Sequence, residues 1–228
     1  MFNPTYLLPS KPGVVRSSSK PSYLRDDTNT VTFDSFFKIV IVLDESGSMQ
    51  GIRNQMIKSI NELILEQKAI KERPATFTLV KFNNRVHKMI TNKLLTEMDT
   101  LSTYDYNPNG STALYDAIGT TVDWFRNEQD VLMVIVTDGE ENASTKYTKS
   151  QINKMIDEKK EKNNWTYVYL SSDLTTERQG NNIGLNKSNY TSNCCVDQSG
   201  FGKFIGESLN SAIGGYRTKG KSVQSQLN

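Results

Sequence analysis

The stretch FFKIVIVLDESGSM, residues 36–49, decides how the rest of the sequence is interpreted. Its first eight residues form an almost continuous apolar run, which is typical of a strand buried at the centre of a parallel sheet. The run ends at Asp44, Ser46 and Ser48, which alternate along the chain. Because alternate residues of an extended segment face the same way, these three side chains are predicted to converge. The stretch therefore predicts a buried strand followed by a loop that holds a ligand.

The sequence beyond this stretch alternates between helical and strand patterns. Apolar residues at helical spacing predict a helix over 51–70, and ATFTLVKF (75–82) predicts the next strand. The turn at Asn83 and Asn84 leads into RVHKMIT, which predicts a hairpin partner. Further strands are predicted at VLMVIVTD (131–138) and WTYVYLSS (165–172), with helices between and after them. This alternation indicates an α/β fold with a mainly parallel sheet.

The composition narrows the classes of function. The 228 residues include 27 basic and 25 acidic side chains, and this balance gives no reason to expect a nucleic-acid partner. No apolar run approaches the roughly 20 residues of a membrane span, and the first residues lack a signal-peptide pattern. The adjacent Cys194 and Cys195 do not form a disulfide framework. These features predict a cytoplasmic protein that acts without a membrane.

Three polar clusters follow predicted strands or precede a predicted helix. They are the Asp44 loop, Gly110-Ser111-Thr112, and Thr137-Asp138-Gly139. Ligands of open α/β sheets bind outside the carboxyl ends of the strands, so these clusters are predicted to share one edge. They offer carboxylates and hydroxyls but no histidine or thiol. This donor set favours Mg²⁺, Mn²⁺ or Ca²⁺ over zinc.

The segments VLDESGSM, GSTALYDAI and VTDGEEN, in this order, resemble the three loops of a von Willebrand factor A-type domain. The resemblance implies a Rossmann-like sheet with one antiparallel edge strand, helices on both faces, and a metal-ion-dependent adhesion site. It implies that Ser46, Ser48 and Thr112 coordinate the metal directly, and that Asp44 and Asp138 act through water. The predicted domain spans 34–216, between an irregular N-terminal arm (1–33) and a polar tail (217–228).

The leading prediction is a binding module that recognises an acidic group of a protein partner through the cation. Glu45, Glu140 and Glu141 are predicted to line the rim of the site, although a solvated surface role would explain them equally. The competing structural interpretation is that Asp44, Ser46 and Thr112 only cap helices. The sequence predicts no oligomeric state and does not identify the partner.

Two other functions remain alternatives. A metal-dependent phosphotransferase would need a second carboxylate two residues after Asp44, where Ser46 stands, and a serine hydrolase would need Gly-x-Ser-x-Gly. The protein is therefore predicted not to be an enzyme. The third function is a structural or assembly component that uses the arm 1–33. The segment TDGEENASTKYT resembles bacterial, phage or viral intracellular members, which would make the protein cytoplasmic or virion-associated.

Overall fold

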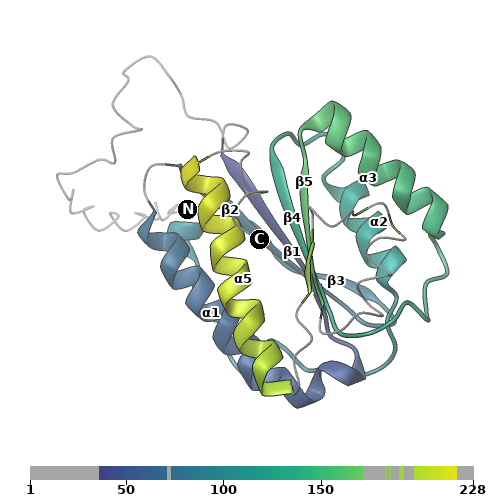
Figure 1. Ribbon diagram of the computed structural model, residues 1–228, viewed down its shortest axis with the longest axis horizontal. Helices are drawn as coiled ribbons and strands as arrows, with labels where there is room; N and C mark the ends of the chain where they lie inside the picture. The colour runs from purple at the N-terminus through teal and green to yellow at the C-terminus, as the bar shows by residue number, and fades with distance from the viewer. Residues whose placement is uncertain are drawn as a thin grey trace, which may run out of the picture. The chain divides into compact units, whose positions relative to one another are not determined.

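The computed structural model describes residues 36–70, 73–171, 183, 185, 190–192 and 198–219. These residues form a six-stranded sheet with the strand order β3-β2-β1-β4-β5-β6 (Figure 1). All neighbouring strands are parallel except β2 and β3, which form an antiparallel hairpin. The predicted mainly parallel sheet with one antiparallel edge strand is thus confirmed. The strands are β1 (Phe37–Asp44), β2 (Ala75–Phe82), β3 (Val86–Leu94), β4 (Val131–Thr137), β5 (Thr166–Ser171) and β6 (Tyr190–Ser192).

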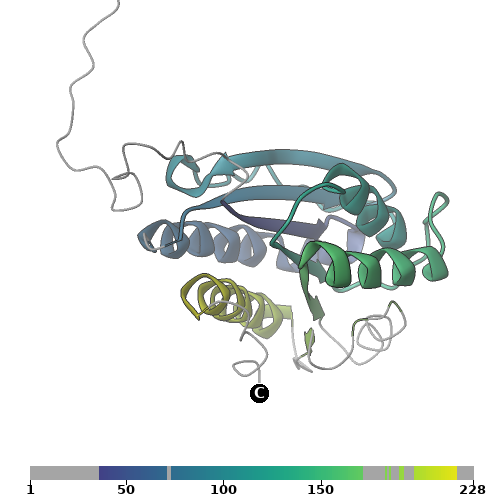
Figure 2. The ribbon, with the colours of Figure 1, turned by 90° about the horizontal axis from the view of Figure 1, so that it is seen from above.

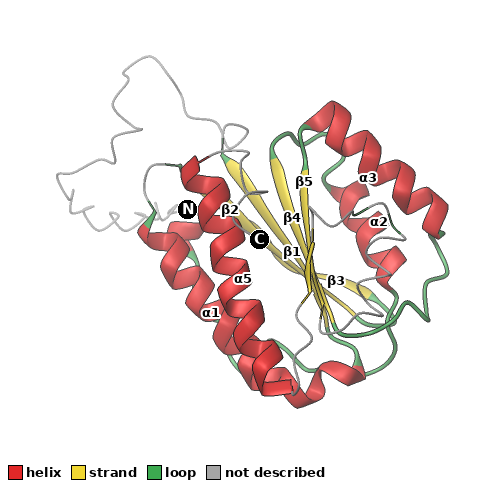
Figure 3. Cartoon of the chain, viewed as in Figure 1, coloured by secondary structure: helices red, strands yellow, loops and turns green. Residues whose placement is uncertain are grey.

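Helices cover both faces of this sheet, as expected for a Rossmann-like fold. Figures 1 and 2 show α1 and α5 on one face and α2 and α3 on the other, with the strands between them in Figure 3. Two 3-10 helices, η3 and η4, follow β1 and β3. The helices are η3 (Gly47–Ile52), α1 (Arg53–Ala69), η4 (Leu95–Glu97), α2 (Leu114–Trp124), α3 (Lys149–Asn163) and α5 (Gln198–Lys219).

The central strand β1 contributes to both hydrophobic cores. Ile39, Ile41 and Leu43 pack in the core beneath α1 and α5, whereas Val40 and Val42 pack in the core beneath α2 and α3. All eight residues of β1 are buried. A strand covered on both faces has no solvent side, and this explains why its sequence is apolar except at Lys38 and Asp44 rather than alternating. The rigid strand delivers Asp44 to the edge of the sheet.

Helix α3 shows how local sequence sets the boundaries of an element. Thr148 and Gln151 form a capping box at its start, in which each side chain accepts a hydrogen bond from the other residue's backbone N–H. The helix ends where Asn164 adopts a left-handed conformation with φ of 59°. This helix therefore has well-defined ends that its own sequence sets.

The predicted polar tail begins too early. Helix α5 continues to Lys219, and Arg217 is only 1% exposed. Its guanidinium donates hydrogen bonds to the backbone carbonyls of Gln67 and Ile70, at the carboxyl end of α1, and of Arg73, which follows the helix. The carbonyls at the helix end lack intrahelical partners, so a buried cation is stabilised there. The boundary at 217 is therefore wrong, and the predicted arm 1–33 lies outside the described residues.

No helix within the described part of the chain is both long enough and apolar enough to cross a membrane.

Candidate metal site

Asp44 lies at the carboxyl end of β1 and is fully buried. Its Oδ1 accepts a hydrogen bond from the backbone N–H of Ser46 at 2.7 Å, and its Oδ2 accepts one from Oγ1 of Thr137 at 2.6 Å. Thr137 ends β4, the parallel neighbour of β1, so the two strands present their last residues side by side. Both carboxylate oxygens of Asp44 are therefore fixed by neighbouring strand ends.

The loop after β1 brings two serine hydroxyls to the same place. The Oγ atoms of Ser46 and Ser48 lie 3.1 Å apart, and Ser48 Oγ donates to Oδ1 of Asp138 at 2.6 Å. The predicted reason for this convergence was wrong, however. Asp44 ends β1 and Ser46 is extended, with φ of −73° and ψ of 168°, but the chain then turns into the 3-10 helix η3, which contains Ser48. A tight turn, not an extended segment, places Ser48 beside Ser46.

Thr112 joins this group through the loop that precedes α2. A Cβ atom built on Gly139 would lie 2.7 Å from Thr112 Oγ1, 3.4 Å from Asp44 Oδ2 and 3.5 Å from Ser48 Oγ. Oxygens of the first two predicted clusters therefore lie around a point beside Gly139 of the third cluster, and Gly139 leaves that point open because it has no side chain. Any larger residue at this position would push a methyl group against the hydroxyl of Thr112.

The interpretation of these residues as helix caps is not supported. Ser46 stands at the N-cap of η3 but makes no side-chain cap hydrogen bond, and the N-cap of α1 is Ile52. The N-cap of α2 is Ala113, so Thr112 is not the capping residue. The hydroxyls of Ser46 and Thr112 are therefore not engaged in capping the helices that follow them.

Burial makes the Asp44 carboxyl a weaker acid than an exposed aspartate. Loss of solvent raises the pKa of Asp44 to about 6 from an ordinary value of 3.8, and the negative charge of Asp138 adds to the effect. Hydrogen bonds from Thr137 and Ser46 partly offset this increase. Two carboxylates share a poorly solvated site, so a positive charge placed between them would stabilise their ionised forms.

The donors present fit a cation that prefers oxygen. The site combines two carboxylates with three hydroxyls, a set that suits magnesium, manganese or calcium. Among the described residues, no group of three or more His, Cys, Asp or Glu side chains is placed to hold a metal. His87 lies exposed on β3 and belongs to no such group. A zinc centre built from imidazole and thiolate is therefore not the chemistry of this site.

Glu45 does not line the rim of the site. It is only 7% exposed, and its Oε1 pairs with Lys81 Nζ at 2.8 Å and accepts a hydrogen bond from the Asn107 backbone N–H at 2.6 Å. Lys81 lies on β2, beside β1, and Asn107 belongs to the loop before α2. The prediction for Glu45 is wrong because partners distant in sequence draw its side chain inward.

Glu141 also has a structural role, whereas Glu140 is exposed and its place at the rim stays a prediction. The Glu141 carboxylate accepts hydrogen bonds from the backbone N–H groups of Tyr115, Ala143 and Ser144, at 2.9, 2.9 and 2.7 Å. Tyr115 belongs to the first turn of α2, where a negative charge is favoured. Glu141 thus fastens the loop after β4 to the start of α2.

A second segment, residues 105–110, holds the Asp44 loop in place. The hydroxyl of the buried Tyr106 donates to the Asp44 carbonyl at 2.5 Å, and the Asn109 N–H donates to the Glu45 carbonyl at 2.8 Å. The Gly47 N–H donates to the carbonyl of Gly110, whose φ of 76° favours glycine. The attachment of this segment to the Asp44 loop could not be predicted from the sequence, because the two segments lie about 60 residues apart.

Comparison with known proteins agrees with this geometry. The family model of the von Willebrand factor type A domain matches residues 38–200. The chain belongs to the von Willebrand factor type A family. A search of curated proteins found no match. The sequence resemblance is thus confirmed at the level of the family and its fold.

Solved structures of von Willebrand factor type A domains share this fold at low sequence identity. One from Catenulispora acidiphila has a TM-score of 0.53 and 16% identity over 79% of this chain and 43% of that chain. The ArnB paralog VWA2 from Sulfolobus acidocaldarius has a TM-score of 0.54 and 16% identity over 76% of this chain and 45% of that chain. The chain thus spans less than half of the length of these two structures. The SpRpn10 VWA domain has a TM-score of 0.53 and 13% identity over 73% of this chain and 93% of that domain's chain.

Proposed function

We propose that this von Willebrand factor type A domain is a metal-dependent module that binds an acidic group of a protein partner. The proposed ligands of a divalent cation, Mg²⁺ or alternatively Mn²⁺ or Ca²⁺, are Asp44, Ser46, Ser48, Thr112 and Asp138. The observation that carries the proposal is the convergence of three loops at the open point beside Gly139, where Asp44, Ser48 and Thr112 place oxygens and Ser48 bonds Asp138. A cation held there supplies a positive charge that can accept an anionic oxygen from outside the protein.

The hydrogen bonds of the site support a division of labour among the donors. Both oxygens of Asp44 already accept hydrogen bonds, from Ser46 and Thr137, so Asp44 is suited to act on a cation through water. The hydroxyls of Ser46, Ser48 and Thr112 are neutral and leave the charge of a cation largely uncompensated. Such a site favours an additional anionic ligand, and a carboxylate of a partner provides one.

Several features favour binding over catalysis. Asp44 is fully buried and hydrogen-bonded at both oxygens, so it is poorly placed to attack a substrate as a phosphotransferase nucleophile would. His87, the one histidine of the sequence, lies exposed on the edge strand β3. A hydrolase or phosphotransferase therefore remains the weaker alternative. Phosphatase activity that disappears in Asp138→Ala would establish it.

The other alternative, an assembly component that uses the arm 1–33, stays a prediction, as do the cytoplasmic or virion-associated location and the likeness to bacterial, phage or viral members. Removal of residues 1–33 followed by light scattering tests the assembly role. A smaller oligomer after truncation would support it, and an unchanged mass would count against it.

Calorimetric titration with Mg²⁺ and Mn²⁺ tests the proposed function. The wild type is expected to bind one of these ions, whereas Asp44→Asn and Ser48→Ala are expected to lose that binding. Glu66→Gln, which removes an exposed carboxylate on α1, serves as the matched control and is expected to bind like the wild type. Equal titration curves for the wild type and Asp44→Asn would refute the metal assignment.

A further inference from the structure

The backbone of Thr112 is held by two other loops. Its N–H donates to Oδ1 of Asn142 at 2.9 Å, and its carbonyl accepts a hydrogen bond from the N–H of Asn142 at 3.0 Å. The N–H of the next residue, Ala113, donates to the carbonyl of Asn83 at 3.0 Å. Asn142 belongs to the loop after β4, residues 138–148, and Asn83 to the turn between β2 and β3. The segment that enters α2 is therefore fixed before the helix begins.

The two hydrogen bonds to Asn142 restrict the direction of the Thr112 side chain. They fix the peptide groups on both sides of the Thr112 Cα atom, and so they restrict both of its backbone dihedrals. A β-branched side chain has few χ1 choices, so its hydroxyl follows the backbone closely. Thr112 is only 3% exposed, so water is a poor substitute for a lost partner of its N–H. The position of the Thr112 hydroxyl therefore depends on the Asn142 side chain.

The loop after β4 also caps α2, a task that a threonine before the helix could otherwise perform. The N–H of Tyr115 donates to Oε2 of Glu141 at 2.9 Å, and the N–H of Asp116 donates to Oγ of Ser144 at 3.0 Å. A threonine hydroxyl commonly accepts from the N–H three residues later, and for Thr112 that N–H is the one bonded to Glu141. Among the described residues, none shares a hydrogen bond with the Thr112 hydroxyl. The hydroxyl is thus available to a cation.

Asn142 also fixes Thr112 relative to the other proposed ligands. Asp138 and Gly139 begin the loop that carries Asn142. A Cβ atom built on Gly139 would lie 2.7 Å from Thr112 Oγ1, so this hydroxyl lies against the first residues of the loop. Ser48 Oγ donates to Asp138 Oδ1 at 2.6 Å. Mg²⁺ tolerates little departure from octahedral geometry at about 2.1 Å, so a displaced hydroxyl would weaken its binding.

We propose that Asn142 is a positioning residue of the metal site, which holds the Thr112 hydroxyl in place for the cation. Asn142 acts through the backbone of Thr112 and not on the cation itself. The loop after β4 then has two tasks, because it supplies one proposed ligand, Asp138, and places another. This inference rests on the proposed function, since it assigns how one ligand of that site is held.

Three substitutions of Asn142 separate the hydrogen bond from charge. Asn142→Ala removes the acceptor for the Thr112 N–H. Asn142→Asp keeps an acceptor oxygen at the same distance from the backbone, whereas Asn142→Glu carries the same negative charge on a longer side chain. Asn142 is exposed, so none of these changes opens a cavity in the core. If added charge alone attracted the cation, both acidic variants would bind it; if placement of Thr112 decides, only Asn142→Asp does.

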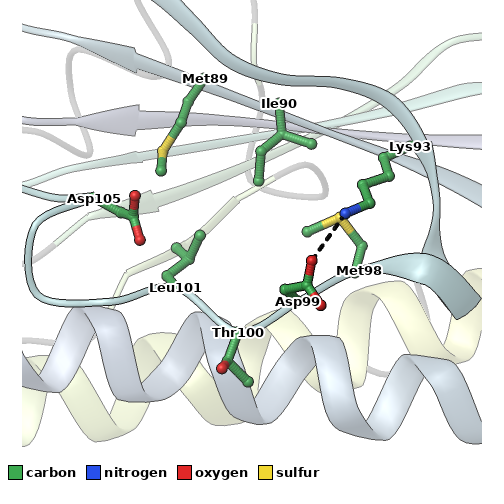
Figure 4. A pocket seen from close by; sticks show the side chains of 8 residues that line it. All are labelled: Met89, Ile90, Lys93, Met98, Asp99, Thr100, Leu101 and Asp105. Carbon is green, nitrogen blue, oxygen red and sulfur yellow. Dashed lines mark hydrogen bonds and ion pairs between the residues drawn. The ribbon is translucent and has the colours of Figure 1, made fainter.

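Two control variants separate positioning from general effects. Asp116→Asn loosens the same loop, because the Asp116 carboxylate accepts hydrogen bonds from the backbone N–H groups of residues 145–147, each at 2.9 Å, and none from Thr112. Asp99→Asn removes one negative charge from an exposed ion pair with Lys93, at the margin of a small pocket beside β3 (Figure 4). It measures how far the loss of a carboxylate by itself changes the affinity for Mg²⁺.

Hydrogen exchange and calorimetry of the full chain read the role of Asn142. Exchange of the Thr112 N–H, followed by NMR in chelator, reports its hydrogen bond without any metal. Asn142→Ala and Asn142→Glu are expected to lose about tenfold or more of this protection and about tenfold or more of the affinity for Mg²⁺. Asn142→Asp is expected to stay close to the wild type in both measurements. Asp116→Asn and Asp99→Asn are expected to keep the protection of Thr112 and the affinity of the wild type.

The inference is overturned if the wild type binds Mg²⁺ and Asn142→Ala binds it equally well, or if Asp116→Asn weakens binding as much as Asn142→Ala does. Binding restored by Asn142→Glu would assign the effect to charge and overturn it too. The comparison of Asn142→Asp with Asn142→Glu decides the matter even where Asn142→Ala does not fold. A wild type that binds neither Mg²⁺ nor Mn²⁺ would refute the proposed function itself, and the inference with it.

Discussion

Replacement of Asp44 by asparagine is expected to stabilise the metal-free protein while it removes metal binding. The carboxyl is fully buried, and its pKa is raised to about 6 from an ordinary value of 3.8. The folded protein therefore holds this proton more tightly than the unfolded chain does. As the pH rises from about 4 to about 6, the unfolded chain loses the proton first, so the free energy of unfolding falls, and it stays low above pH 6.

The size of the effect follows from the pKa shift. A shift of about 2 units corresponds to roughly 3 kcal/mol of unfolding free energy that ionised Asp44 costs the folded protein. Asparagine removes this cost, but its amide N–H groups need acceptors where Thr137 now donates to Oδ2 of Asp44. That rearrangement costs about 1 kcal/mol, so the net gain in neutral solution is expected to be about 1–2 kcal/mol.

Urea denaturation of the full chain in chelator measures this gain. At neutral pH, Asp44→Asn is expected to unfold at a higher urea concentration than the wild type. Below about pH 4, where Asp44 is protonated, only the cost of the amide remains, so the variant is expected to be about 1 kcal/mol less stable than the wild type. Added Mg²⁺ should raise the stability of the wild type only. Glu66→Gln, at an exposed position, should unfold like the wild type both in chelator and with added Mg²⁺. A variant that is less stable than the wild type in chelator at neutral pH would refute the reasoning.

Three further predictions address single residues. Gly139→Ala is expected to weaken Mg²⁺ binding about tenfold or more, because the methyl group of the alanine would lie 2.7 Å from Thr112 Oγ1. An unchanged affinity for Mg²⁺ in calorimetry would contradict this. The affinity of the wild type for Mg²⁺ should fall about tenfold for each pH unit below about 6, as protons compete for Asp44; a flat profile between pH 4 and 6 would exclude this competition. Arg217→Met is expected to lower the free energy of unfolding, measured by urea denaturation, by about 3 kcal/mol, because buried backbone carbonyls near the end of α1 lose their donors. A loss well below about 1 kcal/mol would show that water replaces the guanidinium.

The fold and the location of the site could be predicted because both leave local patterns in the sequence. Strands covered on both faces, such as β1 and β4, are almost entirely apolar, and their ends are marked by Asp44 and Asp138. The order of strands along the chain then places these ends at one edge. Local sequence was sufficient for this part of the structure.

The roles of several polar side chains could not be predicted, because their partners lie far away along the chain. Glu45 and Glu141 look like exposed acids in the sequence, yet Lys81 and the start of α2 hold them inward. Arg217 looks like part of a polar tail, but its acceptors lie about 150 residues earlier, at Gln67. Sequence patterns report whether a residue is polar, and only the tertiary structure shows whether its charge meets water or another group.

A crystal structure of the full chain grown with Mn²⁺ tests the central claim most directly. Anomalous scattering identifies the ion independently of the protein model-building. The account predicts a single strong anomalous peak within bonding distance of the hydroxyls of Ser46, Ser48 and Thr112, close to Asp44 and Asp138. An anomalous map without a peak at this position, from crystals with Mn²⁺ in excess, would contradict it.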